Sequence, residues 1–190
     1  MEVKLTSATN TRRSTQRGFT ILEVLIAAVI ITIGMVSLLG LFASALSSMQ
    51  LSQEELIAKQ KSKEMLEAIY AARNSQQITF DMIQNTSDGG IFLAGPQQLK
   101  DSGPDGIPDT ADDGQLEAIV LPGPDGVLGT ADDEHRPLTG FSREVIFRPL
   151  LRPDASFNPD LRQVDVKLSY FTAGGKQRSY NLSGYISRYR

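Results

Sequence analysis

Hydrophobic residues are distributed very unevenly along this chain. Residues 19–46 read FTILEVLIAAVIITIGMVSLLGLFASAL and contain one charged residue, Glu23. An apolar run of this length can cross a bilayer core of about 30 Å as a helix. Residues 47–72 are rich in Ala, Leu, Glu, Lys, Gln and Met, which are good helix formers. The pattern therefore predicts one helix from about Thr20 to Ala72, roughly 80 Å long at 1.5 Å per residue.

The second half of this predicted helix is amphipathic. Leu51, Ala58, Met65 and Ile69 fall near one helical stripe, with Leu66 beside it. A single apolar stripe on an otherwise polar helix is the face that packs against a domain. We therefore expect a soluble domain to pack on the second half only.

The C-terminal third has the pattern of an antiparallel sheet. Strands are expected at 143–151, which Pro153 ends, at 163–171, where apolar and polar residues alternate, and at 178–190. A glycine-containing turn separates the last two, which form a hairpin. Residues 73–160 are loop-rich, with short elements expected at 78–84 and 91–93 and a short strand at 116–121. The predicted fold class is α+β: a long N-terminal helix packed on a small C-terminal antiparallel β-sheet.

The first 18 residues are polar and basic, and their composition predicts a disordered segment. Positive charge ahead of an apolar helix directs the N-terminus to the cytoplasm. A secretory signal peptide cleaved near Ala43-Ser44-Ala45 is one alternative, but the apolar run is about twice the usual length. A plain membrane anchor is another. A plain anchor does not explain the presence of Glu23, since a carboxylate in hydrocarbon costs about 2.5–3.5 kcal/mol.

Charge and composition exclude several functions. The formal net charge is −3, which does not indicate nucleic-acid binding. The chain has no cysteine, so disulfides, thiolate chemistry and zinc ribbons are excluded. Its single histidine, His135, leaves little material for His-based catalysis. A non-enzymatic role is expected.

The junction RGFTILEVLIA at residues 17–27 resembles that of type IV prepilins and type II secretion pseudopilins. A basic residue, Gly, Phe and then Glu at the fifth position after the Gly open a long apolar helix. The resemblance implies cleavage between Gly18 and Phe19 by a prepilin peptidase, and N-methylation of Phe19. It also implies that Glu23 pairs with the N-terminus of a neighbouring subunit. The implied location is the inner membrane, single-pass with a cytoplasmic N-terminus, and then a cell-surface filament of pilin or pseudopilin subunits.

The apolar segment lacks the proline that major pilins often carry there. The runs IGMVSLLGLFASALSSMQ (33–50) and KSKEMLEAIYAARN (61–74) resemble PilV-type minor pilins more than a major subunit. The implied organisation is a leader at 1–18, a transmembrane and filament-core helix at 19–46, an amphipathic helix at 47–72, and an extracytoplasmic domain at 73–190 with its sheet at 141–190.

An acidic internal repeat lies at residues 101–134, which hold ten acids and no Lys or Arg. Copy one, GPDGIPDTADD (103–113), and copy two, GPDGVLGTADD (123–133), match at eight of eleven positions. A solvated loop needs acidic composition but no such order. Ile107 and Val127, which follow the second Gly of each copy, are expected to anchor the loops to the core.

The segment DGIPD of copy one resembles the core of thrombospondin type 3-like calcium repeats. Closely spaced carboxylates around a Gly turn suit Ca²⁺, which takes six to eight oxygen ligands. The candidate ligands are Asp101, Asp105, Asp109, Asp112 and Asp113 around copy one, and Asp125, Asp132 and Asp133 in copy two. Copy two has Gly129 in place of Asp109, and both copies lack the tight D-x-D-x-D spacing. A solvated acidic loop is the alternative.

The sequence thus predicts a minor pilin-like subunit assembled into a type IV pilus. A minor pseudopilin of a type II secretion system and a membrane-anchored calcium-binding surface domain remain alternatives. Glu23 distinguishes an assembling subunit from a simple membrane anchor, because only the assembling subunit needs this carboxylate.

Overall fold

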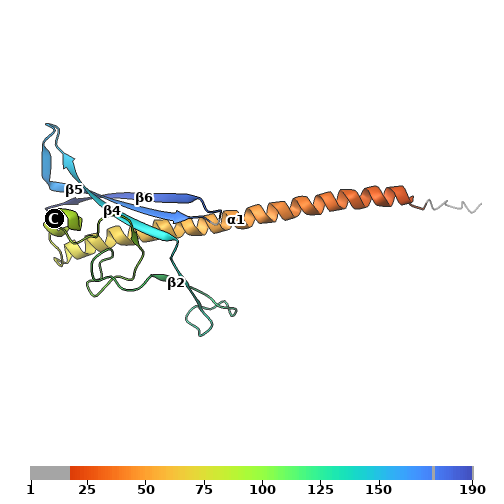
Figure 1. Cartoon of the computed structure of the whole chain (residues 1–190), viewed down its shortest axis with the longest axis horizontal. Coiled ribbons are helices and arrows are strands. Elements are labelled where there is room, and N and C mark those ends of the chain that lie inside the picture. Colours follow the sequence, from red (N-terminus) through yellow and green to blue (C-terminus); the bar gives the residue numbers. More distant parts are fainter. Residues whose placement is uncertain (1–17, 173, 190) are drawn as a thin grey trace, which may run out of the picture. The chain divides into compact units, whose positions relative to one another are not determined.

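The computed structural model describes residues 18–172 and 174–189 (Figure 1). The expected disordered leader therefore falls, apart from Gly18, outside the described residues. The chain divides into two compact units, of which the first ends at Ala45 and the second begins at Leu46.

Helix α1 (Ile21–Asn74) confirms the long helix that the sequence predicts. Every residue from Ile21 to Gln50 is exposed. The buried positions all lie in the later turns: Ala58, Ser62, Met65, Ile69 and Ala72. This spacing of three and four residues places them on one face. Packing on the second half of the helix is confirmed, and Ser62 joins the stripe by donating its hydroxyl to the carbonyl of Ala58.

A four-stranded antiparallel sheet in the order β1-β4-β5-β6 packs on that face. Its strands are β1 (Gln97–Gln98), β4 (Phe141–Leu151), β5 (Phe157–Phe171) and β6 (Gln177–Ser187). The α+β fold class is confirmed. Strand β5 starts earlier than the pattern predicts, because Phe157 and Asn158 pair with β4 beyond an irregularity at Pro149/Leu150.

The core is formed by residues of α1, the loop segment and the sheet. It includes Met65 and Ile69 from the helix, Phe92 and Ile107 from the loops, and Val164 from β5, all at most 1% exposed. Gly184 of β6 lies against the ends of the Tyr70 and Leu66 side chains of α1, which a Cβ there would have to displace. The helix and sheet are thus in direct contact, and the loops close one side of the core.

The segment between α1 and β4 forms short elements. Helix η1 (Phe80–Met82) lies within the short element expected at 78–84. Helix η2 (Thr86–Asp88) falls between the two expected elements, and the segment 91–93 contains only an isolated bridge between Phe92 and Asn85. Strands β2 (Ala118–Leu121) and β3 (Glu134–Pro137) form a separate antiparallel hairpin. The hydrophobic pattern indicates β2 but not β3, whose four residues are all exposed. Copy two is the loop of this hairpin.

Candidate functional site

The predicted cleavage site lies immediately before the helix. Gly18, Phe19 and Thr20 are exposed and have no regular secondary structure. Thr20 caps α1: its hydroxyl accepts a hydrogen bond from the backbone N–H of Glu23 at 3.3 Å. The Gly18–Phe19 bond therefore lies outside the helix, in backbone that a peptidase can bind in an extended form.

Glu23 lies in the first turn of α1. A negative charge is favourable there, because the N–H groups of a helix start carry partial positive charge. The side chain forms no ion pair with any described residue, and its neighbours along the helix are exposed apolar side chains. A free positive N-terminus on another chain would be a suitable partner.

The surface around Glu23 is apolar. The most hydrophobic 18-residue window of α1 has a mean hydropathy of 2.7, and none of it is buried within the protein. By length and composition this helix can cross a membrane. Exposed apolar surface of this extent marks a region that lipid or other subunits cover.

The two acidic copies form the same turn. In each, the first Asp accepts the backbone N–H two residues later, from Ile107 at 2.7 Å in copy one and from Val127 at 2.8 Å in copy two. Asp112 and Asp132 each accept the hydroxyl of the Thr two residues earlier, at 2.6 and 2.7 Å. These bonds explain why the order of residues repeats: the carboxylates satisfy local donors.

A further bond of the turn also repeats, whereas the bond from the Thr110 hydroxyl to Asp105 at 3.2 Å belongs to copy one. Asp113 accepts the N–H of Asp109 at 2.8 Å, and Asp133 accepts the N–H of Gly129 at 2.6 Å. At the first glycine of each copy, Gly103 or Gly123, a Cβ would collide with the backbone carbonyl of the second-to-last residue of that copy, Asp112 or Asp132. Glycine is therefore required there in both copies.

Copy one is docked on the domain. Ile107 is 1% exposed and belongs to the core, as predicted. Asp109 is 1% exposed and accepts two hydrogen bonds from Arg143 of β4, from Nε at 2.7 Å and from a terminal guanidinium nitrogen at 2.9 Å. This two-pronged geometry is the strongest form of an Arg–carboxylate pair. It fixes copy one to the sheet.

A second ion pair holds the segment after copy one. Lys61 of α1 contacts both Glu64, at 2.7 Å, and Glu117. Burial lowers the pKa of Lys61, but the hydrogen bonds to Glu117 and Glu64 outweigh it and raise the pKa overall. Burial likewise opposes ionisation of Glu64, yet the bond from Lys61 keeps its pKa below the usual value. The ionised forms of Lys61 and Glu64 are thus favoured where α1 contacts the segment after copy one.

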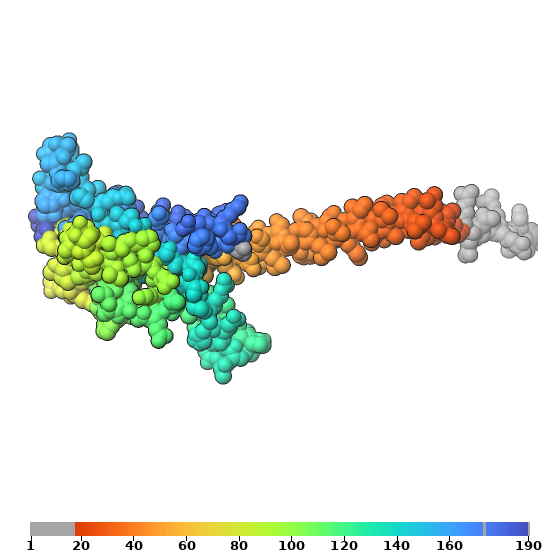
Figure 2. Space-filling model, in the orientation of Figure 1, coloured from red at the N-terminus to blue at the C-terminus, as the bar shows by residue number. Residues whose placement is uncertain are grey.

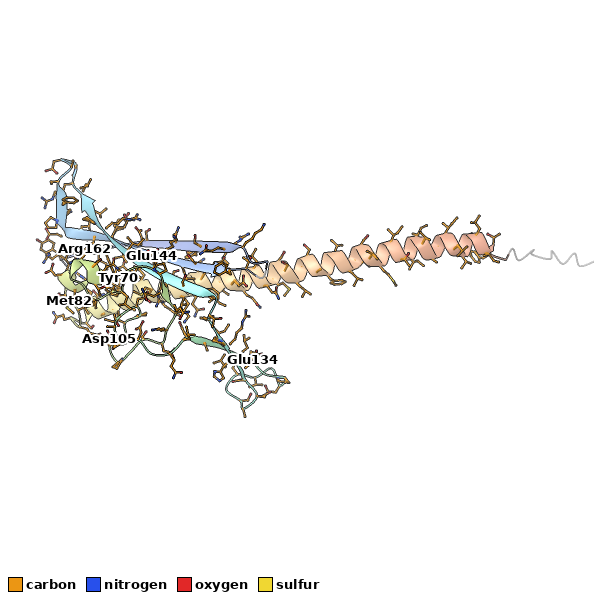
Figure 3. The ribbon with its side chains drawn as sticks, viewed as in Figure 1. Tyr70, Met82, Asp105, Glu134, Glu144 and Arg162 are labelled. Carbon is orange, nitrogen blue, oxygen red and sulfur yellow. The ribbon has the colours of Figure 1, made fainter. Side chains whose placement is uncertain are left out.

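Copy two is not docked. Val127 is 56% exposed and Leu128 is 61% exposed, so the prediction that Val127 anchors its loop to the core is wrong. Figure 2 shows the segment that contains copy two standing away from the rest of its domain. In Figure 3, Asp105 of copy one lies against the domain, whereas Glu134, next to copy two, lies on the projecting hairpin. The hairpin keeps the loop at a distance from the core.

Calcium binding stays a prediction. One observation favours it: Oδ1 of Asp113 and Oδ1 of Asp133 are both buried without a hydrogen-bond partner among the described residues. Two observations oppose it. Both oxygens of Asp109 are bonded to Arg143. Within residues 18–172 and 174–189, no three acidic or histidine side chains form a group that could hold a metal ion.

The comparisons with known proteins concern the N-terminal junction. Residues 13–39 match the family described as the prokaryotic N-terminal methylation motif. This segment contains Gly18, Phe19 and Glu23. The curated proteins contain no significant match to the chain, and neither do the solved structures. The chain thus carries a prepilin-type methylation motif at the start of an uncovered apolar helix, which supports a place among type IV pilins and pseudopilins.

Proposed function

We propose that this protein is a pilin-like structural subunit, cleaved by a prepilin peptidase after Gly18, methylated on Phe19 and assembled with other pilin subunits into a filament. The observation that carries the proposal is the methylation motif on a helix that is entirely exposed over residues 21–50. Lipid covers such a helix before assembly, and neighbouring helices cover it afterwards.

Glu23 favours assembly of the helix with other subunits over simple anchoring in the membrane. An isolated carboxylate in a membrane costs about 2.5–3.5 kcal/mol, and a free N-terminal amine is also costly there. Pairing the two groups between neighbouring subunits compensates both. The pairing also sets how far one helix is shifted along the next.

Within this class we propose a minor pilin of a type IV pilus. The support is the resemblance of residues 33–50 and 61–74 to PilV-type subunits and the absence of proline from the apolar segment. A minor pseudopilin of a type II secretion system is the alternative. Deleting the gene separates them: loss of surface pili supports the first, and loss of protein secretion with intact pili supports the second.

Processing is tested on the chain isolated from its native membranes. Intact mass should show loss of residues 1–18 and the addition of one methyl group. Gly18→Val should leave the full-length chain, because the peptidase must bind the backbone closely at this residue. A mature chain that begins near Leu46 would show that the apolar segment is a signal peptide.

Assembly is tested with Glu23→Ala, and Glu67→Ala is the matched control. Glu67 is an exposed residue of the same helix whose ion pair with Lys63 is fully on the surface. We expect Glu23→Ala to be inserted and cleaved but absent from sheared filaments, while the control assembles. Recovery of both variants in filaments at the wild-type level would leave a membrane-anchored surface domain as the better description.

A further inference from the structure

Two adjoining hollows lie beside the turns of α1 that follow its fully exposed stretch. The larger, the apolar groove, has a volume of about 640 Å³ and runs between α1, the β2–β3 hairpin and the ends of β4 and β5. The smaller, the polar hollow, has a volume of about 200 Å³ and carries the charged residues Glu54, Lys176 and Arg178. Both are lined by Glu54 and Thr172, where they meet. The apolar lining of the groove is formed by Leu56, Ile57, Ile119, Leu121, Phe141 and Phe171.

The hollows begin where the uncharged part of α1 ends. Residues 24–53 carry no charge, and at 1.5 Å per residue they extend about 45 Å. This matches the thickness of a bilayer with both of its head-group layers, about 40–45 Å. Leu46 and Met49, both 63% exposed, continue the apolar surface of α1 up to the hollows. In a membrane-inserted subunit, Glu54 therefore lies at the level of the lipid head groups.

Glu54 needs a hydrogen-bond donor. Its Oε2 is buried and has no hydrogen-bond partner among the described residues. A buried acceptor that is left without a donor is costly, and more so when it is charged. Lys176 and Arg178 line the same hollow, but neither forms an ion pair with Glu54 or with any other described residue. The hollow thus suits a ligand that carries a cationic N–H donor.

The same hollow also suits an anion. Lys176 and Arg178 are exposed and unpaired among the described residues, as is Arg136, which lines the apolar groove. An ammonium group and a phosphate on one ligand would satisfy both kinds of charge. A net negative ligand is disfavoured, because four acids lie at the end of the neighbouring β2–β3 hairpin: Asp125, Asp132, Asp133 and Glu134.

We infer that, before assembly, the extracytoplasmic domain binds a phospholipid of the phosphatidylethanolamine type from the bilayer surface. The ammonium group donates to Oε2 of Glu54, the phosphate faces Lys176 and Arg178, and one acyl chain lies in the apolar groove. The chain covers Leu56 and Phe171, which are otherwise 64% and 59% exposed. The lipid holds the domain against the membrane until the subunit leaves it. The inference rests on the proposed function, because it requires α1 to span the bilayer.

The acyl chain is detected by fluorescence. The protein has no tryptophan, so Phe171→Trp places a single reporter in the apolar groove. The full chain is reconstituted in phosphatidylcholine vesicles with rising fractions of a lipid whose brominated acyl chains quench tryptophan on contact. We expect brominated phosphatidylethanolamine to reach half-maximal quenching at about a tenfold lower fraction than brominated phosphatidylcholine, whose quaternary ammonium has no N–H. Tenfold corresponds to about 1.4 kcal/mol.

Two other reporter positions serve as controls. Tyr185 is 59% exposed on β6 and lines neither hollow, so Tyr185→Trp should be quenched by neither lipid. Leu39 lies in the apolar segment, so Leu39→Trp should be quenched equally by both lipids. Quenching at Leu39→Trp but not at Phe171→Trp would overturn the inference and leave the proposed function intact. An unquenched Leu39→Trp would overturn both.

Substitutions in the Phe171→Trp chain test the head-group contacts. Glu54→Gln should remove most of the preference for phosphatidylethanolamine, because a neutral amide does not attract an ammonium group. Glu67→Gln, on the exposed surface of the same helix, should leave the preference unchanged. Lys176→Ala with Arg178→Ala should weaken quenching by both lipids, since both carry a phosphate.

The result that overturns the inference is equal quenching of Phe171→Trp by the two lipids. Stronger quenching by brominated phosphatidylglycerol would overturn it too, since that lipid is anionic and lacks an ammonium group. The unsubstituted full chain gives a second measurement that does not depend on any variant. Released from micelles with equal amounts of the two lipids into a mass spectrometer, it should retain phosphatidylethanolamine. Retention of neither lipid, or of both equally, would contradict the assignment.

Discussion

The two copies of the acidic turn have nearly the same sequence and share most of their internal hydrogen bonds, yet one is part of the core and the other is on the surface. The difference is concentrated in three adjacent positions. Copy one has Ile107, Pro108 and Asp109, and copy two has Val127, Leu128 and Gly129. The turn therefore forms both in contact with the core and on the surface. The residues that differ in sequence also differ in burial: Ile107 and Asp109 are buried, whereas Val127 and Leu128 are exposed.

The last of these positions is the most informative. Its backbone is left-handed in both copies, with φ of 61° at Asp109 and 89° at Gly129. Glycine adopts this conformation freely, and other L-residues pay about 1–2 kcal/mol, with Asp among the more tolerant. Copy one carries the less favourable residue because its carboxylate pairs with the buried Arg143. Copy two has no such pair and has glycine.

Exchanging the residues at this position should have the largest effect. Asp109→Gly relieves the backbone but leaves Arg143 buried without its partner, and removing one member of a buried pair costs about 3–5 kcal/mol. We expect a net loss of about 3 kcal/mol in the free energy of unfolding, measured by denaturant titration of the full chain in detergent. The reciprocal Gly129→Asp should change stability by less than about 1 kcal/mol, since it alters only an exposed turn. Equal losses for the two variants would mean that the Arg143 pair does not fix copy one.

Removing the apolar side chains should give the next largest difference. Ile107→Ala deletes a core side chain and should cost about 2–5 kcal/mol. Val127→Ala deletes an exposed one and should stay within about 0.5 kcal/mol. The thermal midpoints of the two variants, measured in the same detergent, check this. A comparable drop for Val127→Ala in the isolated subunit would show that copy two is buried after all.

If both copies bind calcium, it would stabilise both and reduce the difference in stability between copy one and copy two. A ligand at one hundred times its dissociation constant stabilises by about 2.7 kcal/mol. We predict a higher melting temperature in millimolar Ca²⁺ than in chelator, and a smaller gain for Asp113→Asn, which changes the carboxylate with the buried unpartnered oxygen. Asp133→Asn is the matched variant in copy two, and Mg²⁺ should have little effect because it demands octahedral geometry. Superimposable melting curves would leave the repeat as a hydrogen-bonded acidic turn.

Titration of the carboxylates should give the smallest effect. Burial raises the pKa of Asp113, and the hydrogen bond from Thr110 lowers the pKa of Asp112. The bond from Thr130 lowers the pKa of Asp132 in the same way. Carboxyl NMR should therefore show Asp113 taking up its proton first as the pH falls, with Asp112 and Asp132 following together.

Protonation of Asp113 and of Asp112 changes the free energy of unfolding in opposite directions. As the pH falls through the raised pKa of Asp113, its protonation removes the cost of burying a charged carboxylate, and the protein becomes more stable. The contribution of Asp112 is present above its unfolded-state pKa and is lost as the pH falls through its lowered one. Protonation of Asp112 before Asp113 would contradict the geometry of the turn.

Much of the fold could be predicted because it follows from periodicity. The apolar run from Phe19 and the stripe through Ala58, Met65 and Ile69 predict α1 and its packed face. Alternation predicts β5, and the glycine-containing turn after it predicts the hairpin with β6. Strand β3 could not be predicted, since its residues are polar and exposed and it exists only by pairing with β2. The different fates of Ile107 and Val127 could not be predicted either, because both are apolar residues after a glycine in the same motif.

The sequence by itself determined the features that are local. The junction around Gly18, Phe19 and Glu23, the long helix and the repeated turn depend on residues close together in the chain, whose spacing is visible in the sequence. Only the tertiary structure decided which copy of the turn is buried, because that depends on Arg143, which lies 34 residues from Asp109 along the chain. It also decided that the base of the β2–β3 hairpin forms a groove with α1. Contacts between distant residues leave no periodic pattern, so burial in the acidic segment is a property of the folded chain.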